Sequence, residues 1–245
     1  MFDHVTIRVS DTDASRRFYA LALSTLRVGE PRVGEGFTEW NDFSISKASD
    51  DKPLTRNLHV AFVSPSREKV DDWWRVMTGA GHEDDGSPGL RPIYRDDYYG
   101  AFVLDPDGNS VEAVSLGTPR EGDEAIDHLW IRVADLAATK RFYETIAPVV
   151  GIRIAGERPE RFHIGTENRS AAFVHDDRPL TQNVHLAFPA ADNATVDEFH
   201  RAALTAGYRD NGPPGERSVY HAGYYGAFVL DPDGNNVEAV CHNRG

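Results

Sequence analysis

Hydrophobic and polar residues alternate in the first segment of the chain, HVTIRV at residues 4–9, and the alternation returns in LHVAFV at 58–63. Successive side chains of a β-strand point to opposite faces, so each segment has one hydrophobic face and one more polar face. The more polar faces carry His4 and His59. Both segments are therefore predicted to be strands. One face of each packs against helices, and the more polar face lies outside this helix-packed core.

A segment with helical spacing follows each of these strands. The first begins at the candidate capping residues 10–12 (SDT) and places Phe18 and Tyr19 on one face. The second runs from about 66 to 78, where apolar residues recur every three or four positions. Short strands are expected from about 26 to 49. The segment AFVL-DPDGN-SVEAV at 101–114 is predicted to form a hairpin, because Pro and Gly suit its turn.

The same pattern occurs twice along the chain. YYGAFVLDPDGNSVEAV at 98–114 returns at 224–240, and the two copies differ only at Ser110 and Asn236. DHVTIRVSD at 3–11 returns as DHLWIRVAD at 127–135, and DDKPLTRNLHVAF at 50–62 as DDRPLTQNVHLAF at 176–188. The chain therefore contains two tandem copies of a unit of about 120 residues.

Each half follows the order βαβββ–βαβββ, so the chain is predicted to be an α+β protein built from four such modules. The expected domains are residues 1–116 and 126–245. The Gly-, Pro- and charge-containing segment at 117–125 is the expected linker.

The charge of the chain restricts its partners. The 245 residues carry a formal net charge of −13, and no basic stripe appears. Nucleic acid is therefore not an expected partner, because such binding depends on neutralising phosphates. No apolar run approaches the roughly 18 residues of a membrane span, so no membrane association is expected. Cys241 is the only cysteine, which favours the reducing cytoplasm. We expect a monomer or homodimer.

Three residues of each half are candidate metal ligands. The strand faces opposite the helix-packing residues carry two imidazoles and one carboxylate in each half, and Glu is otherwise depleted in strands. Such a set can bind a divalent metal and leave positions open for water or substrate. The candidates are His4, His59 and Glu112 in the first half, and His128, His185 and Glu238 in the second.

These residues and motifs resemble the vicinal oxygen chelate superfamily, which includes glyoxalase I, fosfomycin-resistance enzymes, extradiol dioxygenases and bleomycin-binding proteins. The resemblance covers nearly the whole chain. It rests on DHV/DHL, the FY pair of the first helix, NLHVAF/NVHLAF and the closing LDPDGNxVEAV. It implies that βαβββ modules pair into curved half-barrel sheets around a divalent metal ion, either Zn, Ni, Mn or Fe. It also implies that the six candidate residues are the ligands.

The resemblance leaves the activity open. Glyoxalase I has a fourth protein ligand, usually Glu, where this chain has Ser46 and Ala172. Extradiol dioxygenases have a Tyr where Phe102 and Phe228 stand. Fosfomycin-resistance enzymes share the His-x-Thr start at His4, but Trp130 breaks it in the second half. Bleomycin-type binders need no metal and favour an acidic cleft lined by aromatic residues.

The favoured interpretation is a metal-dependent enzyme, of lyase, isomerase or transferase type, that chelates two adjacent oxygens of a small molecule. The alternatives are a non-catalytic small-molecule or antibiotic-binding protein and an Fe(II) extradiol-type dioxygenase. Aromatic and basic residues near the same strands are candidate substrate-binding groups. They are Tyr94, Tyr99, Arg8, Tyr220, Tyr225, Arg132 and His221.

Two groupings of the ligands are compatible with the repeat. In the first, each half binds a metal with its own three residues. In the second, the halves act like a fused dimer: His4 joins His185 and Glu238, and His128 joins His59 and Glu112. The first grouping is the expected one, and the second is the alternative.

Overall fold

The computed structural model describes residues 1–117, 122–165 and 169–243. The chain divides into two compact units, named here unit 1 (Met1–Thr6 with Ile131–Gly245) and unit 2 (Ile7–Trp130). Residues 118–121 of the expected linker lie outside the described residues. The domain boundaries expected from the sequence stay a prediction.

Two strands contribute residues to both units: β1 (His4–Val9) and β9 (Ile126–Arg132). The other elements of unit 2 are α1 (Thr12–Thr25), β2 (Arg32–Gly34), β3 (Phe37–Trp40), β4 (Phe43–Lys47), β5 (His59–Val63), α2 (Arg67–Gly79), β6 (Asp84–Leu90), β7 (Tyr99–Leu104) and β8 (Ser110–Ser115). Those of unit 1 are α3 (Leu136–Val150), β10 (Arg153–Arg158), β11 (Arg161–Gly165), β12 (Ser170–Val174), β13 (His185–Pro189), α4 (Asn193–Thr205), β14 (Arg209–Glu216), β15 (Tyr225–Leu230) and β16 (Asn236–Cys241).

Side-chain caps begin the helices where the sequence predicted them. The Asp11 carboxylate accepts hydrogen bonds from the backbone N–H groups of Asp13 and Ala14 at the start of α1. Ser66 caps α2 in the same way, and the buried faces of the two helices include Phe18 and Trp73. In α4, Phe199 is buried, whereas Leu204 is 38% exposed.

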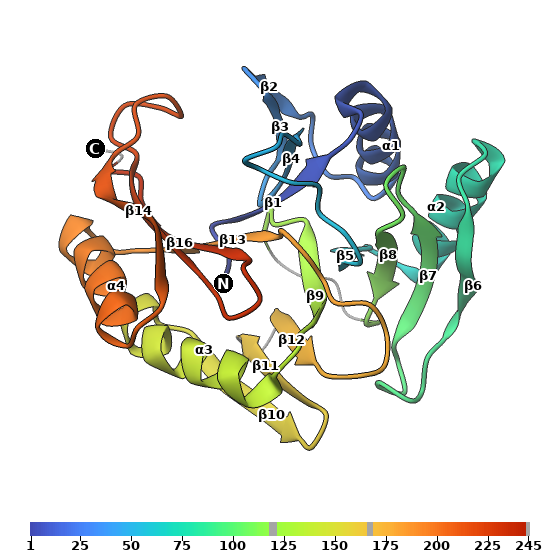
Figure 1. Ribbon diagram of the computed structural model, residues 1–245. Coiled ribbons are helices and arrows are strands. Elements are labelled where there is room, and N and C mark those ends of the chain that lie inside the picture. The colour runs from blue at the N-terminus through green and yellow to red at the C-terminus, as the bar shows by residue number, and fades with distance from the viewer. Residues whose placement is uncertain (118–121, 166–168, 244–245) are drawn as a thin grey trace. The chain divides into compact units, whose positions relative to one another are not determined.

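The helices of each unit pack on strands of the same unit (Figure 1). In unit 2, α2 packs on β6, β7 and β8, and α1 packs on α2 and β4. In unit 1, α4 packs on β14, β15 and β16, and α3 packs on α4 and on β10–β12. The helix-facing strand residues form the core; Val5, Val60 and Val111, for example, are fully buried.

Strand pairing brings the candidate ligands together in a way that repeats in both units. In unit 2 the order is β9-β5-β8-β7-β6, with β5 antiparallel to β9 and parallel to β8. In unit 1 the first strand, β1, is antiparallel to β13, which is parallel to β16. Ala61 pairs with both Glu112 and His128, and Ala187 pairs with both His4 and Glu238.

The expected grouping of each half's own three ligands is therefore wrong, and the exchanged grouping is correct. β1 pairs with β13 of the second repeat, and β9 pairs with β5 of the first. The expectation failed because β1 and β9 have closely similar sequences, DHVTIRVSD and DHLWIRVAD, so either strand suits either partner. No single residue in the sequence discriminates between the two pairings.

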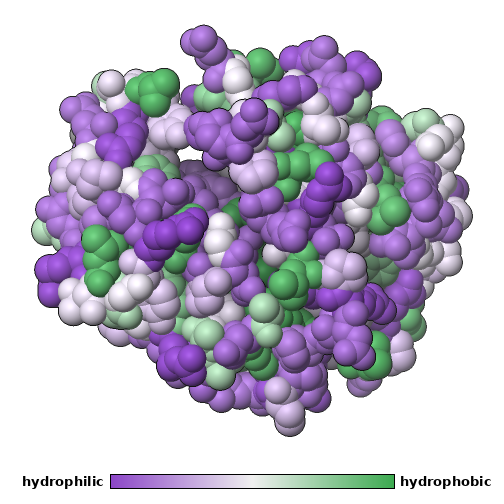
Figure 2. Space-filling model, in the orientation of Figure 1, coloured by the Kyte–Doolittle hydropathy of each residue, from purple (hydrophilic) through white to green (hydrophobic). Residues whose placement is uncertain are grey.

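Hydrophilic residues dominate the face of the molecule shown in Figure 2, and hydrophobic residues are scattered among them. This agrees with the excess of acidic residues that gives the chain its formal net charge of −13. In the described part of the chain, no helix is both long and apolar enough to cross a membrane.

Candidate metal centres

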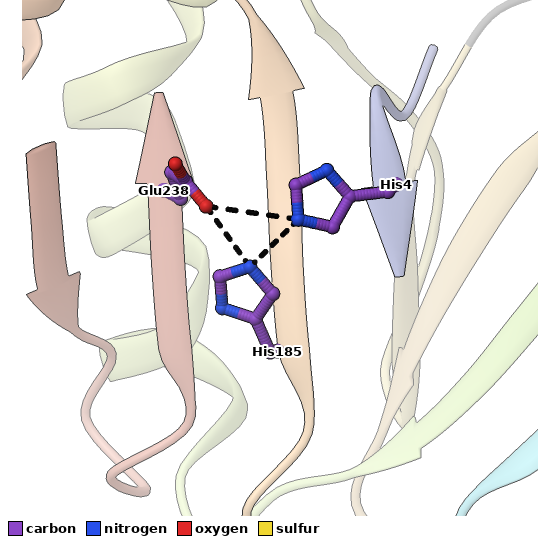
Figure 3. A group of neighbouring side chains, drawn as sticks. All are labelled: His4, His185 and Glu238. Carbon is purple, nitrogen blue, oxygen red and sulfur yellow. Dashed lines mark hydrogen bonds and ion pairs between the residues drawn. The ribbon is translucent and has the colours of Figure 1, made fainter. Parts of the chain in front are cut away.

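Centre 1 consists of His4, His185 and Glu238, which lie on three adjacent strands of unit 1 and point toward one another (Figure 3). The Nε2 atoms of His4 and His185 are 3.2 Å apart. Oε2 of Glu238 lies 3.0 Å from Nε2 of His185 and 3.7 Å from Nε2 of His4. The three potential ligand atoms thus face one common point.

Centre 2 consists of His59, Glu112 and His128 in unit 2 and has the same arrangement. Oε2 of Glu112 lies 3.1 Å from Nε2 of His59 and 3.6 Å from Nε2 of His128. Among the described residues, each centre has three members, and no other group of His, Cys, Asp or Glu converges in this way.

The spacing of these atoms fits a divalent ion. Nitrogen and oxygen ligands lie about 2.0–2.2 Å from zinc and similar ions, so neighbouring ligand atoms are separated by about 2.8–3.6 Å at octahedral or tetrahedral angles. In centre 1 the separations of 3.0 and 3.2 Å lie within that interval, and the separation of 3.7 Å lies just above it. Two neutral imidazoles and one carboxylate also form a donor set that suits zinc, nickel, manganese or iron.

Burial makes the two carboxylates unusual. Glu112 is 0% exposed and Glu238 is 1% exposed. A buried carboxylate is costly unless opposite charge or hydrogen-bond donors compensate it. A cation held by the two imidazoles and the carboxylate would supply that compensation, which agrees with a metal-binding role.

A tyrosine hydroxyl supports each buried carboxylate. Tyr98 donates to Oε1 of Glu112 at 2.7 Å, and Tyr224 donates to Oε1 of Glu238 at 2.7 Å. Burial and the adjacent carboxylate charge raise the pKa of Tyr98 and of Tyr224 far above the ordinary tyrosine value. Both hydroxyls therefore stay protonated and act as hydrogen-bond donors, not as bases.

Each candidate ligand histidine has a further partner at Nδ1. Asp3 contacts His4 at 2.8 Å, and Asp127 contacts His128 at 2.7 Å. A carboxylate that accepts from Nδ1–H holds the imidazole in the tautomer whose Nε2 lone pair is free for a metal. The sequence contains this pair twice, as the Asp-His dipeptides at 3–4 and 127–128, although only the histidines were predicted to have a role.

The candidate tyrosines lie in two different environments. Tyr94 and Tyr220 pack on the tyrosines that contact the carboxylates, with ring centroids 5.2 Å from Tyr98 and 4.8 Å from Tyr224. Tyr99, by contrast, donates to Asp71 of α2 at 2.7 Å. Tyr225 likewise donates to Asp197 of α4 at 2.9 Å. The structure thus brings Tyr94 and Tyr220 toward the centres and directs Tyr99 and Tyr225 to helices.

The candidate basic residues have partners within their own units. Arg8 donates to Ser46, the residue at the position of the fourth glyoxalase I ligand. Arg132 forms an ion pair with Asp176 at 3.2 Å. His221 lies 2.8 Å from His242, which in turn contacts Asp3 at 2.8 Å, so His221 is connected to centre 1 through two intermediates.

Comparisons with known proteins agree with this fold. A family model described as "Glyoxalase/Bleomycin resistance protein/Dioxygenase superfamily" matches residues 1–113 and 125–239. Glyoxalase I from Zea mays is 16% identical, with a TM-score of 0.68, over 98% of this chain and 92% of that one. A Bacillus subtilis protein provisionally named a dioxygenase is 14% identical, with a TM-score of 0.67, over 100% of this chain and 86% of that one. No curated protein matches the sequence. At these identities the structural likeness establishes the fold.

Proposed function

Because the chain belongs to the glyoxalase/bleomycin resistance protein/dioxygenase superfamily, we propose that it is a metal-dependent enzyme acting on a small molecule. The substrate binds through two adjacent oxygens at centre 1, at centre 2 or at both. Lyase, isomerase and transferase chemistry all suit this arrangement. As in the sequence analysis, a cytoplasmic monomer or homodimer remains the expectation.

The observation that carries the proposal is the convergence of two imidazoles and one buried carboxylate in each unit. Three protein ligands leave open positions on a four- to six-coordinate ion. Since the side chains of Ser46 and Ala172 carry no carboxylate, neither position supplies a fourth carboxylate ligand. Two open positions are what a substrate needs to bind through a pair of neighbouring oxygens.

The protein residues have distinct roles in this proposal. His59 and His128 supply neutral nitrogen ligands, and Glu112 supplies one negative charge in a buried site. Tyr98 donates to Glu112 and so keeps the carboxylate in place. A bound divalent metal would act as a Lewis acid, stabilising negative charge that develops on a substrate oxygen.

Aromatic side chains supply a wall beside centre 2. The Tyr94 ring lies 5.2 Å from Tyr98 and 6.4 Å from Trp130, and Tyr94 is 52% exposed. An exposed aromatic ring next to a metal centre suits the apolar part of a small organic substrate. In unit 1, Thr6 occupies the position that corresponds to Trp130, so the side chains beside the two centres differ.

An Fe(II) dioxygenase is the second candidate function. Two histidines and one carboxylate form the facial triad of non-haem iron oxygenases, and this ligand set is what favours the candidate. Phe102 lies beside His59, with ring centroids 5.8 Å apart, at the position where extradiol enzymes have a tyrosine. The hydroxyl that orients a catecholate is therefore absent from that position.

Metal reconstitution combined with substrate screening tests the proposal. The protein is stripped with a chelator and reloaded with Zn, Ni, Mn or, without oxygen, Fe(II). Each form is assayed against α-hydroxy ketones, α-hydroxy acids and catechols, with oxygen uptake recorded. The proposal predicts turnover that chelation abolishes and metal restores, and that Glu112→Gln with Glu238→Gln removes. Oxygen uptake only with Fe(II) would select the dioxygenase.

A binding protein gives a different result in the same experiment. Ligand would then bind stoichiometrically without turnover, and its affinity would survive the double substitution. That outcome would reject the enzyme proposal and select the antibiotic-binding alternative.

A further inference from the structure

The only difference between the near-identical copies at 98–114 and 224–240 lies beside a candidate metal ligand. Ser110 of the first copy contacts Nδ1 of His59, and Asn236 of the second contacts Nδ1 of His185. The residue that contacts Nδ1 of His59 in centre 2, or Nδ1 of His185 in centre 1, is thus the one position at which the two copies differ.

In unit 2 the contact continues to a carboxylate. The Ser110 hydroxyl donates to Oδ2 of Asp85 at 2.7 Å, and Nδ1 of His59 lies 3.1 Å from the same hydroxyl oxygen. A carboxylate only accepts hydrogen bonds, so the single hydroxyl proton is committed to Asp85. Ser110 can then only accept from Nδ1–H of His59. This arrangement holds the Nε2 lone pair of His59 ready for a metal.

In unit 1 two amides replace the hydroxyl and the carboxylate. Asn211, at the position of Asp85, donates through Nδ2 to Oδ1 of Asn236 at 2.9 Å. Nδ2 of Asn236 lies 2.6 Å from Nδ1 of His185. With the amides in this orientation Nδ1 accepts, which places the imidazole proton on Nε2, the atom that faces Glu238. Metal binding through Nε2 then requires both amides to turn.

We call the two hydrogen-bond chains, His59–Ser110–Asp85 and His185–Asn236–Asn211, relays. The two relays differ in charge and in how firmly they fix the imidazole tautomer. The relay from His59 ends on a carboxylate and permits one tautomer, whereas the relay from His185 is neutral and permits either. A negative charge behind the imidazole increases its basicity as a ligand, and outer partners of this kind change metal affinity by about 10–100-fold.

The other histidine of each centre, His4 or His128, has the same kind of partner at Nδ1 in both centres. His4 and His128 both contact the preceding aspartate, at 2.8 and 2.7 Å. Asp3 also contacts His242, and Arg95, whose pKa is raised mainly by its hydrogen bond to Asp97 and least by the charge of Asp127, is a basic neighbour of Asp127. The clearest difference is thus the Ser110–Asp85 pair against the Asn236–Asn211 pair.

We propose that the two metal centres have unequal affinities, that centre 2 binds a divalent ion more tightly, and that Ser110 and Asp85 cause the difference. The inference rests on the proposed metal-dependent function. Ser110 and Asp85 are positioning residues, because they act on the metal through His59. The two centres then load in sequence as metal becomes available, with centre 2 filled first.

Exchanging the two relays tests the proposal. Glu238→Gln leaves only centre 2 intact, and Glu112→Gln leaves only centre 1 intact. The affinity of each for Zn²⁺ is measured by competition with a chromophoric chelator at fixed pH. We expect centre 2 to bind at least tenfold more tightly, on the scale of outer-partner effects.

Relay variants are then made in each background. Ser110→Asn with Asp85→Asn should weaken centre 2 about tenfold, and Asn236→Ser with Asn211→Asp should strengthen centre 1 by a similar factor. Glu83→Gln removes one exposed negative charge two residues from Asp85 and is the matched control; it should leave the affinity of centre 2 unchanged.

A structural role alone would not produce these results, because misfolding cannot raise the affinity of centre 1. Nitrogen NMR of the metal-free protein adds an independent measurement: His59 should carry its proton on Nδ1, and the Ser110→Asn, Asp85→Asn variant should lose that preference. Equal affinities of the two centres, or exchange variants that leave them unchanged, would overturn the inference. Absence of Zn²⁺ binding at both centres would instead reject the proposed function.

Discussion

A methyl group added at Gly226 should disable centre 1 with little effect on the fold. Gly226 lies on β15 and pairs with Val240 of β16, which is two residues from Glu238 and shares its face of the strand. A Cβ at this position would lie 2.6 Å from Oε1 of Glu238 and 3.2 Å from Cε1 of Tyr224, whereas real Cβ contacts essentially never fall below 3.0 Å. The carboxylate must therefore move by at least about 0.4 Å, which exceeds the tolerance of about 0.2 Å in metal–ligand distances.

The cost to stability should be small because the group that must move is the end of a side chain. Gly→Ala also restricts the unfolded chain, which offsets part of the strain by about 0.4–1 kcal/mol. We expect the free energy of unfolding of Gly226→Ala to change by no more than about 1 kcal/mol. The Zn²⁺ affinity of centre 1, in contrast, should fall at least about tenfold.

Competition titration in the Glu112→Gln background, where only centre 1 remains, measures this affinity. Denaturant unfolding of the same variant measures its stability. Gly79→Ala is the matched control, since a Cβ there meets nothing within 4 Å. Unchanged Zn²⁺ affinity in a folded Gly226→Ala variant would refute the assignment of the Glu238 carboxylate as a ligand.

Two further predictions concern buried acidic groups. Burial raises the pKa of Asp231 from 3.8 to about 6, so its contribution to stability is full below about pH 4 and is lost as the pH rises through 6. The unfolding free energy of the wild type minus that of Asp231→Asn should therefore fall by about 2 kcal/mol from pH 4 to pH 7, and a difference that rises or stays constant would contradict this. Tyr98→Phe removes a donor to buried Glu112 and should cost about 1–3 kcal/mol of unfolding free energy in the metal-free protein. Denaturation with and without Zn²⁺ checks this, since a bound cation should reduce the loss and an equal loss in both would argue against it.

The sequence was sufficient to predict the α+β modules and the face on which the candidate ligands lie. Strand alternation places His4, His59 and Glu112 opposite the buried valines, and a single polar residue amid hydrophobic neighbours is visible without coordinates. The identity of the partner strand was not predictable, because β1 and β9 carry equivalent residues. Pairing between repeats depends on long-range packing that two nearly equal copies do not encode locally.

The tyrosines show a second limit. In the sequence either tyrosine of each pair, Tyr98–Tyr99 and Tyr224–Tyr225, suits the cavity, and Tyr99 and Tyr225 are the predicted substrate-binding groups. In the structure Tyr98 and Tyr224 contact the buried carboxylates. Strand parity explains the difference: Tyr98 and Gly100 are two residues apart and therefore share a face. Gly100 has no side chain and lies against both Glu112 and Tyr98, which leaves room for the hydroxyl to reach the carboxylate. The Tyr-Tyr-Gly order in each repeat contains that signal once the strand start is known.

We propose that each unit holds a divalent metal ion with two histidines and one glutamate, the residues that converge in each centre. Elemental analysis of protein purified without added metal, alongside the Glu112→Gln, Glu238→Gln variant, tests it most directly. We predict a divalent metal in the wild type, rising to two ions per chain after incubation with excess metal and buffer exchange, and loss of nearly all of it in the double variant. Metal-free wild-type protein that takes up no ion, or a double variant with the same metal content as the wild type, would contradict the claim.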